Sequence, residues 1–301
     1  MIERFRKPYL NAYKFAHRVT LPGFDGMPMS RVFSFFYRGI VNGAITTRSS
    51  AISFNLFVAL FPALIFLFTL IPFIPIDNFQ ETLLSLFKEI IPDSAWDSVE
   101  YTVLDIVLRP HESWLSIGFI LALFFSTNGI DSMIEAFNAS FHSMETRGFL
   151  AQRWIAFVLV LVLAFMLVVA ISFITIGSGL LQYFRAEGFF QDYFTYFLLD
   201  SLRWVVLVTL TYFGISIIYY WGPSKKRPFK FFSAGSSLTT FVIMLTNVGF
   251  NFYANNLAAY NALYGSIGTL LLILLWIYFN STILLIGFEL NVSILNAKKS
   301  K

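Results

Sequence analysis

Long apolar runs without charge are the main pattern along this chain. The first, from Ala51 to Pro75, holds no Asp, Glu, Lys or Arg. A helix needs about 20 mostly apolar residues to cross the hydrocarbon layer of a membrane, so each such run predicts a transmembrane helix. The expected fold class is an all-α, polytopic membrane bundle of six transmembrane helices with amphipathic interfacial helices. The expected spans are about 51–74, 113–130, 154–178, 202–221, 232–252 and 266–290.

The segments between these runs differ in the sign of their charge. Residues 1–50 carry eight Lys and Arg against two acids, and residues 222–231 carry four bases and no acid. Residues 76–112 carry eight acids against two bases. Because Lys and Arg in short loops mark the cytoplasmic side, both termini are expected in the cytoplasm.

The segments outside the spans predict further helices. Residues 30–48 place Arg31 and Arg38 on one face and apolar side chains on the other, which is typical of a helix lying on the inner leaflet. Residues 79–109 predict two short outer helices broken at Pro92. The expected organisation is a basic cytoplasmic segment (1–50), a six-span membrane domain (51–295) with an outer acidic helical insert (about 76–112), and a basic cytoplasmic tail (296–301).

Composition agrees with a membrane location and narrows the chemistry. Apolar residues make up 57% of the chain and charged residues 13%, whereas soluble domains carry about 25% charged residues. The absence of cysteine excludes disulfides, Cys-ligated metals and a thiol nucleophile. The three histidines are scattered, and no nucleotide-binding or hydrolase motif is present. We therefore expect no cofactor, no metal, no nucleic-acid partner and no enzymatic activity.

A polar stripe runs along the fifth expected span. Its members recur every three or four residues, which places them on one face of a helix. Polar side chains are costly in hydrocarbon, so this face is expected to turn inward. Two interpretations stay open: hydrogen bonds between helices, each worth about 0.6 kcal/mol, or the wall of a polar cavity. The stripe comprises the six polar residues Ser233, Ser236, Thr240, Asn247, Asn251 and Asn255, with Met244 at the same spacing between them.

A second stripe follows the second span on a helix expected from Ser113 to about Met144. It comprises Asn128, Asp131, Glu135, Asn138 and His142. A helix of that length exceeds the roughly 30 Å hydrocarbon core, so its end is expected to project into the cytoplasm or the headgroup layer. The stripe is either a solvated face or a site that binds a cation or relays protons.

Glu289 follows an uncharged stretch from Ser266 to Phe288. An unpaired carboxylate in the membrane interior is costly, so we expect an ion pair with Arg48, Arg147 or Arg153. Structural and functional roles for that pair are equally open.

Several ordered motifs resemble a known family. Tyr264-Gly265-Ser266 precedes a Leu-rich span that closes on Gly287-Phe288-Glu289-Leu290-Asn291. Upstream matches are Phe61-Pro62, Asn128 to Asn138, Glu145-Thr146-Arg147 followed by Arg153, and the basic hairpin from Pro223 to Pro228. Over residues 30–295 the chain resembles the YihY/virulence factor BrkB family of bacterial inner-membrane proteins. The resemblance implies six spans and a location in the inner membrane. It supplies no reaction, and the old ribonuclease label of some members is disfavoured by the absence of a metal-ligand cluster.

These patterns favour a transporter or lipid-handling protein that moves a small molecule or lipid through a polar cavity. A non-catalytic scaffold for the envelope is the alternative, and a membrane-embedded hydrolase is third. The expected partners are membrane lipids and a small-molecule or lipid substrate. The residues expected along the cavity are Asn247, Asn251, Asn255, Tyr264, Gly265, Ser266, Glu289 and Asn291. A cytoplasmic polar network is expected from Arg48, Asn128, Asp131, Glu135, Asn138, Glu145, Arg147 and Arg153.

Overall fold

The regular elements in the part of the chain that the computed structural model describes are all helices. The described residues are 19–70, 112–140, 147–186, 193–224, 232–256 and 258–300, with a few single positions between 72 and 108. Within helices, side chains are not described at 67, 68, 70, 112–114, 171, 172, 174–186, 193–196, 198–200, 202, 203, 254–256, 258–267 and 269. The two outer helices expected over 79–109 lie almost wholly outside the described residues, as do His142 and Glu145.

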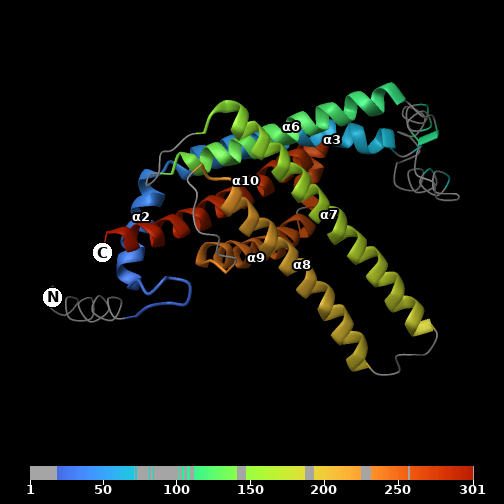
Figure 1. Ribbon diagram of the computed structural model, residues 1–301. Helices are drawn as coiled ribbons and strands as arrows, with labels where there is room; N and C mark the ends of the chain where they lie inside the picture. The colour runs from blue at the N-terminus through green and yellow to red at the C-terminus, as the bar shows by residue number, and fades with distance from the viewer. Residues whose placement is uncertain are drawn as a thin grey trace. The chain divides into compact units, whose positions relative to one another are not determined.

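The described helices follow the apolar runs of the sequence (Figure 1). Five of them, namely α3, α6, α7, α8 and α10, are long and apolar enough to cross a membrane. The sequence predicts six spans, and five of the described helices have the length and composition of a span. The sixth, α9, is 23 residues long, but its Ser, Thr and Asn residues lower its hydropathy. The bounds are α2 (Met29–Asn42), α3 (Ile45–Leu70), α6 (Glu112–Asn138), α7 (Phe149–Ala186), α8 (Tyr193–Trp221), α9 (Ala234–Asn256) and α10 (Ala258–Lys299).

The amphipathic helix ends earlier than its expected limit at residue 48. A Cβ atom on Gly43 would lie 2.1 Å from the carbonyl oxygen of Gly39, so no other residue fits there without movement. Ala44 adopts a positive φ of 47°, which interrupts right-handed helix. As a result α3 begins at Ile45 and Arg48 belongs to its first turn. Similarly, α6 ends at Asn138 and does not reach Met144.

The chain forms two compact units, residues 54–129 and the remainder. In the smaller unit, α3 and α6 run antiparallel. A Cβ atom on Gly118 would lie 3.4 Å from the Cα atom of Phe66, and one on Gly129 would lie 2.6 Å from Leu56 Cδ2. Two glycines on α6 therefore allow this close approach, as small residues do at helix contacts in membranes.

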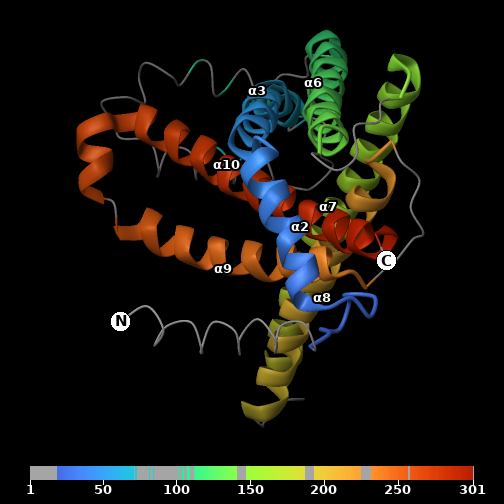
Figure 2. The same cartoon turned by 90° about the vertical axis from the view of Figure 1, so that its left-hand side faces the viewer.

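In the larger unit, α10 packs against α9 and α2, and α8 packs against α7 and α9 (Figure 2). A Cβ atom on Gly287 would lie 1.8 Å from Thr239 Oγ1, and one on Gly235 would lie 2.2 Å from the Gly287 carbonyl oxygen. The backbones of α9 and α10 thus meet directly at these two glycines.

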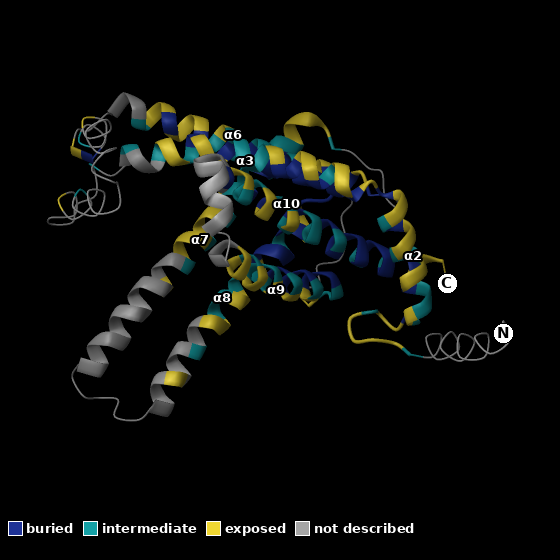
Figure 3. Cartoon of the chain, turned by 180° about the vertical axis from the view of Figure 1, so that it is seen from behind, coloured by how far each residue is buried: buried dark blue, intermediate teal, exposed yellow. Residues whose placement is uncertain are grey.

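Burial in the larger unit concentrates on the second half of α10, the end of α6 and the first half of α9 (Figure 3). Met27 and Val32 join Leu290, Ile294 and Ala297 in one apolar cluster, which holds the start of α2 against the end of α10. In contrast, only 11% of the apolar window of α7 is buried. Exposed aliphatic and aromatic surface of this extent is expected where lipid is the solvent.

Candidate functional site

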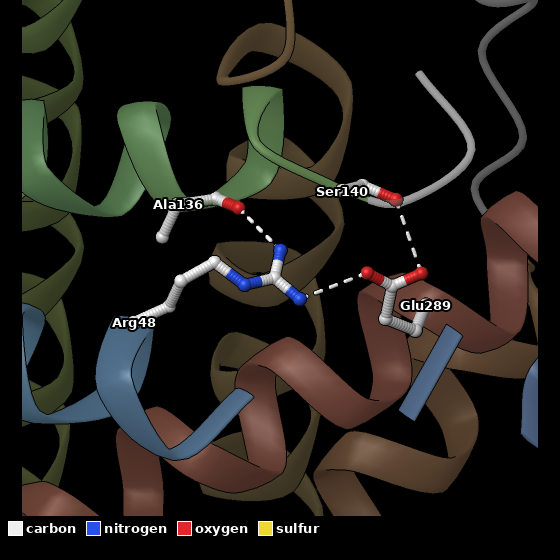
Figure 4. Close-up of polar contacts among 4 residues, drawn as sticks. All are labelled: Arg48, Ala136, Ser140 and Glu289. Atoms are coloured by element: carbon white, nitrogen blue, oxygen red, sulfur yellow. Dashed lines mark hydrogen bonds and ion pairs between the residues drawn. The ribbon is translucent and has the colours of Figure 1, made fainter. Parts of the chain in front are cut away.

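A buried ion pair joins the start of α3 to the second half of α10 (Figure 4). Arg48 Nη2 donates to Glu289 Oε1 at 3.0 Å, and Arg48 Nη1 donates to the carbonyl oxygen of Ala136 at 2.7 Å. The hydroxyl of Ser140 donates to Glu289 Oε2 at 3.0 Å. Glu289 is fully buried, and each of its carboxylate oxygens has a donor. A buried charge is tolerated when it is paired and hydrogen-bonded in this way.

Aromatic rings enclose the neighbourhood of this ion pair. The ring of Phe137 stacks on Phe288 with centroids 4.4 Å apart and meets the edge of Tyr219 at 5.7 Å. The Tyr219 hydroxyl donates to the Leu284 carbonyl oxygen at 2.6 Å and lies 2.7 Å from Thr239 Oγ1. The ends of α6 and α8 and the adjoining turns of α9 and α10 are therefore fixed around Glu289.

A separate pocket of about 140 Å³ lies between α8, α9 and α10. Its polar wall is made of hydroxyl and amide groups. Asp25 and Lys298 also line it and form an ion pair of 4.0 Å. The Lys298 side chain is 60% exposed, so the pocket opens at the end of α10. The lining residues are Gly23, Asp25, Ser216, Tyr219, Tyr220, Ser233, Ala234, Ser236, Phe288, Asn291, Ile294, Leu295 and Lys298.

Asn291 fixes the wall of this pocket by joining α10 to the start of α9. Its Oδ1 atom accepts from the backbone N–H of Gly235 at 2.8 Å, and its Nδ2 atom donates to Ser233 Oγ at 3.0 Å. Ser233 Oγ also accepts from the backbone N–H of Ser236 at 3.0 Å, which is an N-cap for α9. The wall is thus preorganised by neutral groups.

The structure separates the residues expected along the cavity. Asn291 lines the pocket with Ser233 and Ser236, the first two residues of the stripe. Glu289 does not line it. Asn247 accepts from Trp276 Nε1 at 2.9 Å, and Asn251 is exposed. The side chains of Asn255, Tyr264 and Ser266, together with Gly265, fall in the stretch whose side chains are not described.

The expected cytoplasmic network divides into distinct clusters. Arg48 belongs to the ion pair with Glu289. Asp131 accepts from Gln152 Nε2 at 2.7 Å and pairs with Arg153 at 3.5 Å, which ties α6 to α7. Asn138 Oδ1 accepts from the backbone N–H of Ser224 at 2.7 Å.

Arg147 forms a further cluster at the end of α8. Its Nη1 atom donates to the carbonyl oxygens of Trp221 and Gly222, both at 3.1 Å, and its Nη2 atom donates to that of Pro223. These bonds satisfy carbonyls that a helix end leaves unpaired. Burial lowers the pKa of the Arg147 guanidinium, which stays protonated at neutral pH.

Two expected members of the network lie elsewhere. Glu135 is exposed on α6. Asn128 is half-buried and belongs to the smaller unit.

Sequence reasoning missed the contribution of α8. Ser216 and Tyr219 are polar groups in an apolar span, three residues apart, and this spacing is the signal that predicts a shared face. Gln152 and Ser140 were also missed, because neither belongs to a periodic stripe. Among the described residues, no group of three or more His, Asp and Glu side chains is placed to hold a metal ion.

Long apolar helices with mostly exposed apolar surface define an integral membrane protein. The family model for Virulence factor BrkB matches residues 36–301, and the chain belongs to this family, as its motifs predicted.

Its curated relatives are distant in sequence. YfkH of Bacillus subtilis, named a ribonuclease-like protein, is 25% identical over 84% of this chain and 91% of its own length. A UPF0761 membrane protein of Idiomarina loihiensis is 23% identical over 72% of this chain and 74% of its own length. Another, from Aggregatibacter aphrophilus, is 22% identical over 88% of this chain and 92% of its own length. No solved structure matches.

Proposed function

We propose that this protein is a transporter or lipid-handling protein of the bacterial inner membrane, with both termini in the cytoplasm. The pocket between α8, α9 and α10 binds a small polar molecule or a lipid headgroup during its passage. The observation that carries this proposal is the pocket itself, which has hydroxyl and amide groups on one wall, apolar side chains on the rest, and the Asp25–Lys298 ion pair at its end.

The chemistry of the pocket suits a neutral or zwitterionic group. Ser216, Ser236 and Asn291 offer hydrogen bonds without net charge, and the two opposite charges lie at the exposed end. A volume of about 140 Å³ is large enough to hold several water molecules. Such a space fits a small polyol or the polar part of a lipid.

The outward continuation of the path is the polar stripe of α9 and the first turns of α10. Asn247, Asn251 and Asn255 extend from the pocket toward the opposite end of α9, and Tyr264-Gly265-Ser266 lie near the start of α10. Polar residues at these positions provide hydrogen-bonding partners across the apolar part of the bilayer. Glu289 holds the neighbouring helices in place and has no contact with the substrate in this proposal.

The test is reconstitution of the full chain in liposomes with two probes. One is a fluorescent NBD-labelled phospholipid whose transfer between leaflets is followed by dithionite quenching. The other is glycerol, whose entry is followed by vesicle swelling. Leu295→Trp fills the pocket without removing a polar group. Leu275→Trp places the same ring on α10 at a residue 37% exposed and outside the pocket.

We expect the wild-type chain and Leu275→Trp to accelerate one probe over protein-free liposomes, and Leu295→Trp to lose that acceleration. The proposal fails if the wild-type chain accelerates neither probe. It also fails if Leu295→Trp moves the accelerated probe at the wild-type rate.

A non-catalytic scaffold is the second candidate. The ion pair between Arg48 and Glu289 favours it, because this contact fixes helices and leaves no space for a ligand. If the protein is a scaffold, cells carrying Leu295→Trp keep a normal envelope. Replacing the basic residues of the segment 225–230 then weakens the envelope.

A further inference from the structure

A second cavity, of about 380 Å³, lies along α7 and α8. It is lined by Arg147, Trp154, Ile155, Val158, Tyr220 and Trp221. Tyr220 also lines the pocket described above, so this side chain separates the two spaces. We call the second cavity the α7–α8 groove.

The lining of the groove changes in polarity along α7. Arg147 precedes the helix, Trp154 lies in its second turn, and Ile155 and Val158 follow. Trp154, Tyr220 and Trp221 are 65%, 39% and 41% exposed, respectively. Amphipathic aromatic side chains of this kind are enriched where hydrocarbon meets headgroups. The order from charged to aromatic to aliphatic is the order of groups in a phospholipid, from its phosphate to its acyl chains.

Arg147 keeps donors for a further acceptor. A guanidinium has five N–H groups. Among the described residues, three of them are directed at the carbonyl oxygens of Trp221, Gly222 and Pro223. The bonds to these carbonyls hold the guanidinium in the groove. Its Nε–H and remaining Nη2–H have no partner among the described residues, and in this proposal they donate to phosphate oxygens. Arginine binds phosphate through paired N–H groups of this kind.

We propose that the α7–α8 groove binds one anionic phospholipid, with its phosphate on Arg147 and an acyl chain along Ile155 and Val158. Both flanking helices contain membrane spans by length and composition, which gives lipid direct access to the groove. Basic pockets between transmembrane helices on the cytoplasmic side bind anionic headgroups in this way. Free phosphate lacks the chain that the aliphatic part accommodates. This site is independent of whether the pocket between α8, α9 and α10 carries a substrate.

The test measures the thermal stability of the purified full-length chain in a neutral detergent, with phosphatidylglycerol added. Val158→Trp fills the groove and leaves the carbonyl bonds of Arg147 intact. Val168→Trp, at a residue of α7 that is 58% exposed and does not line the groove, is the matched control. Trp154→Ala is a second variant, which removes an aromatic wall without overfilling the space.

We expect phosphatidylglycerol to raise the melting temperature of wild type and Val168→Trp by several degrees, because a ligand of the folded state stabilises it. The shift should disappear in Val158→Trp and fall by at least half in Trp154→Ala. Inorganic phosphate alone should give no shift.

Three outcomes overturn the proposal. The first is a full lipid shift in both groove variants, and the second is an equal shift with inorganic phosphate. The third is a change in oligomeric mass, measured by light scattering, in the groove variants while their lipid-induced shift in melting temperature stays intact. That result would mean that a second copy of this chain occupies the groove. Loss of flux in Leu295→Trp bears on the pocket alone, so the two proposals fail separately.

Discussion

Two regions of α10 use polar residues in opposite ways, although they lie only two positions apart. Glu289 is fully buried, charged and paired with Arg48 and Ser140. Asn291 is neutral, bonds to Gly235 and Ser233, and lines an open pocket. Two residues correspond to about 200° around a helix, so these side chains leave α10 in nearly opposite directions.

The difference shows where charge and space are placed in this bundle. A buried carboxylate requires fixed partners on several sides, and this requirement ties α10 to the start of α3 and the end of α6. A neutral amide satisfies part of its hydrogen-bonding capacity with backbone and hydroxyl groups and can leave a polar wall beside empty space. The charged region therefore fixes the helices, and the neutral region leaves room for a ligand.

The largest effect should come from breaking the charged region. Glu289→Gln removes the carboxylate and leaves Arg48 buried with its charge uncompensated, so we expect a loss of about 3–5 kcal/mol in the free energy of unfolding. Reversible unfolding in mixed micelles measures it.

Glu135→Gln is the matched control for this change, because Glu135 is exposed on α6 and should alter stability by less than about 0.5 kcal/mol. Equal effects of the two substitutions would mean that the buried ion pair does not fix the helices.

A smaller effect is expected at the contact between α9 and α10. The new methyl of Gly287→Ala would lie 1.8 Å from Thr239 Oγ1 and 2.7 Å from the Tyr219 hydroxyl oxygen. The helices must separate or side chains must shift, which costs about 1–3 kcal/mol. The same unfolding assay measures it.

Gly249→Ala on α9 is its control, because nothing lies within 4 Å of the added methyl. Alanine favours a helix over glycine by about 1 kcal/mol, so this variant should be as stable as wild type or more stable. A stable Gly287→Ala variant would show that the two backbones do not meet.

The smallest effect should come from the ion pair at the pocket opening. Asp25 and Lys298 are 4.0 Å apart, and Lys298 is mostly exposed. Lys298→Gln should therefore change the unfolding free energy by less than about 0.5 kcal/mol, since solvent screens such pairs. The unfolding assay at low and high salt checks this. A loss comparable with that of Glu289→Gln would erase the contrast between the two regions.

Much of this arrangement could be predicted from the sequence, for reasons that particular residues make clear. Apolar runs predict α3, α7 and α10 because burial in lipid demands a minimum length. Arg48 was one of three candidate partners for Glu289, since charge and approximate depth are readable in the sequence. The break that brings Arg48 into α3 was not predicted, because it depends on the conformation of Gly43 and Ala44.

The polar stripe of α9 shows that the spacing of residues predicts a shared helix face but not the burial of each residue on it. Its spacing places Ser236 and Asn251 on one face, yet Ser236 is buried at the pocket and Asn251 is exposed. Spacing defines which residues share a face. Which neighbouring helix covers each turn depends on tertiary contacts such as Gly235 with Gly287. The same reason explains why Ser216 and Tyr219 of α8 were not selected.

Water access to the pocket tests the central claim most directly. The chain contains no cysteine, so an introduced thiol is the only one that reacts. Leu295→Cys places a thiol in the pocket, and Val292→Cys places one on the same helix at a residue that is 1% exposed and outside the pocket. A membrane-impermeant methanethiosulfonate reagent is applied to inside-out vesicles and to intact spheroplasts. The account predicts rapid modification of Leu295→Cys in inside-out vesicles only, with Val292→Cys unreactive in both. Equal reactivity of the two thiols, or reaction of Leu295→Cys only from the outside, would contradict it.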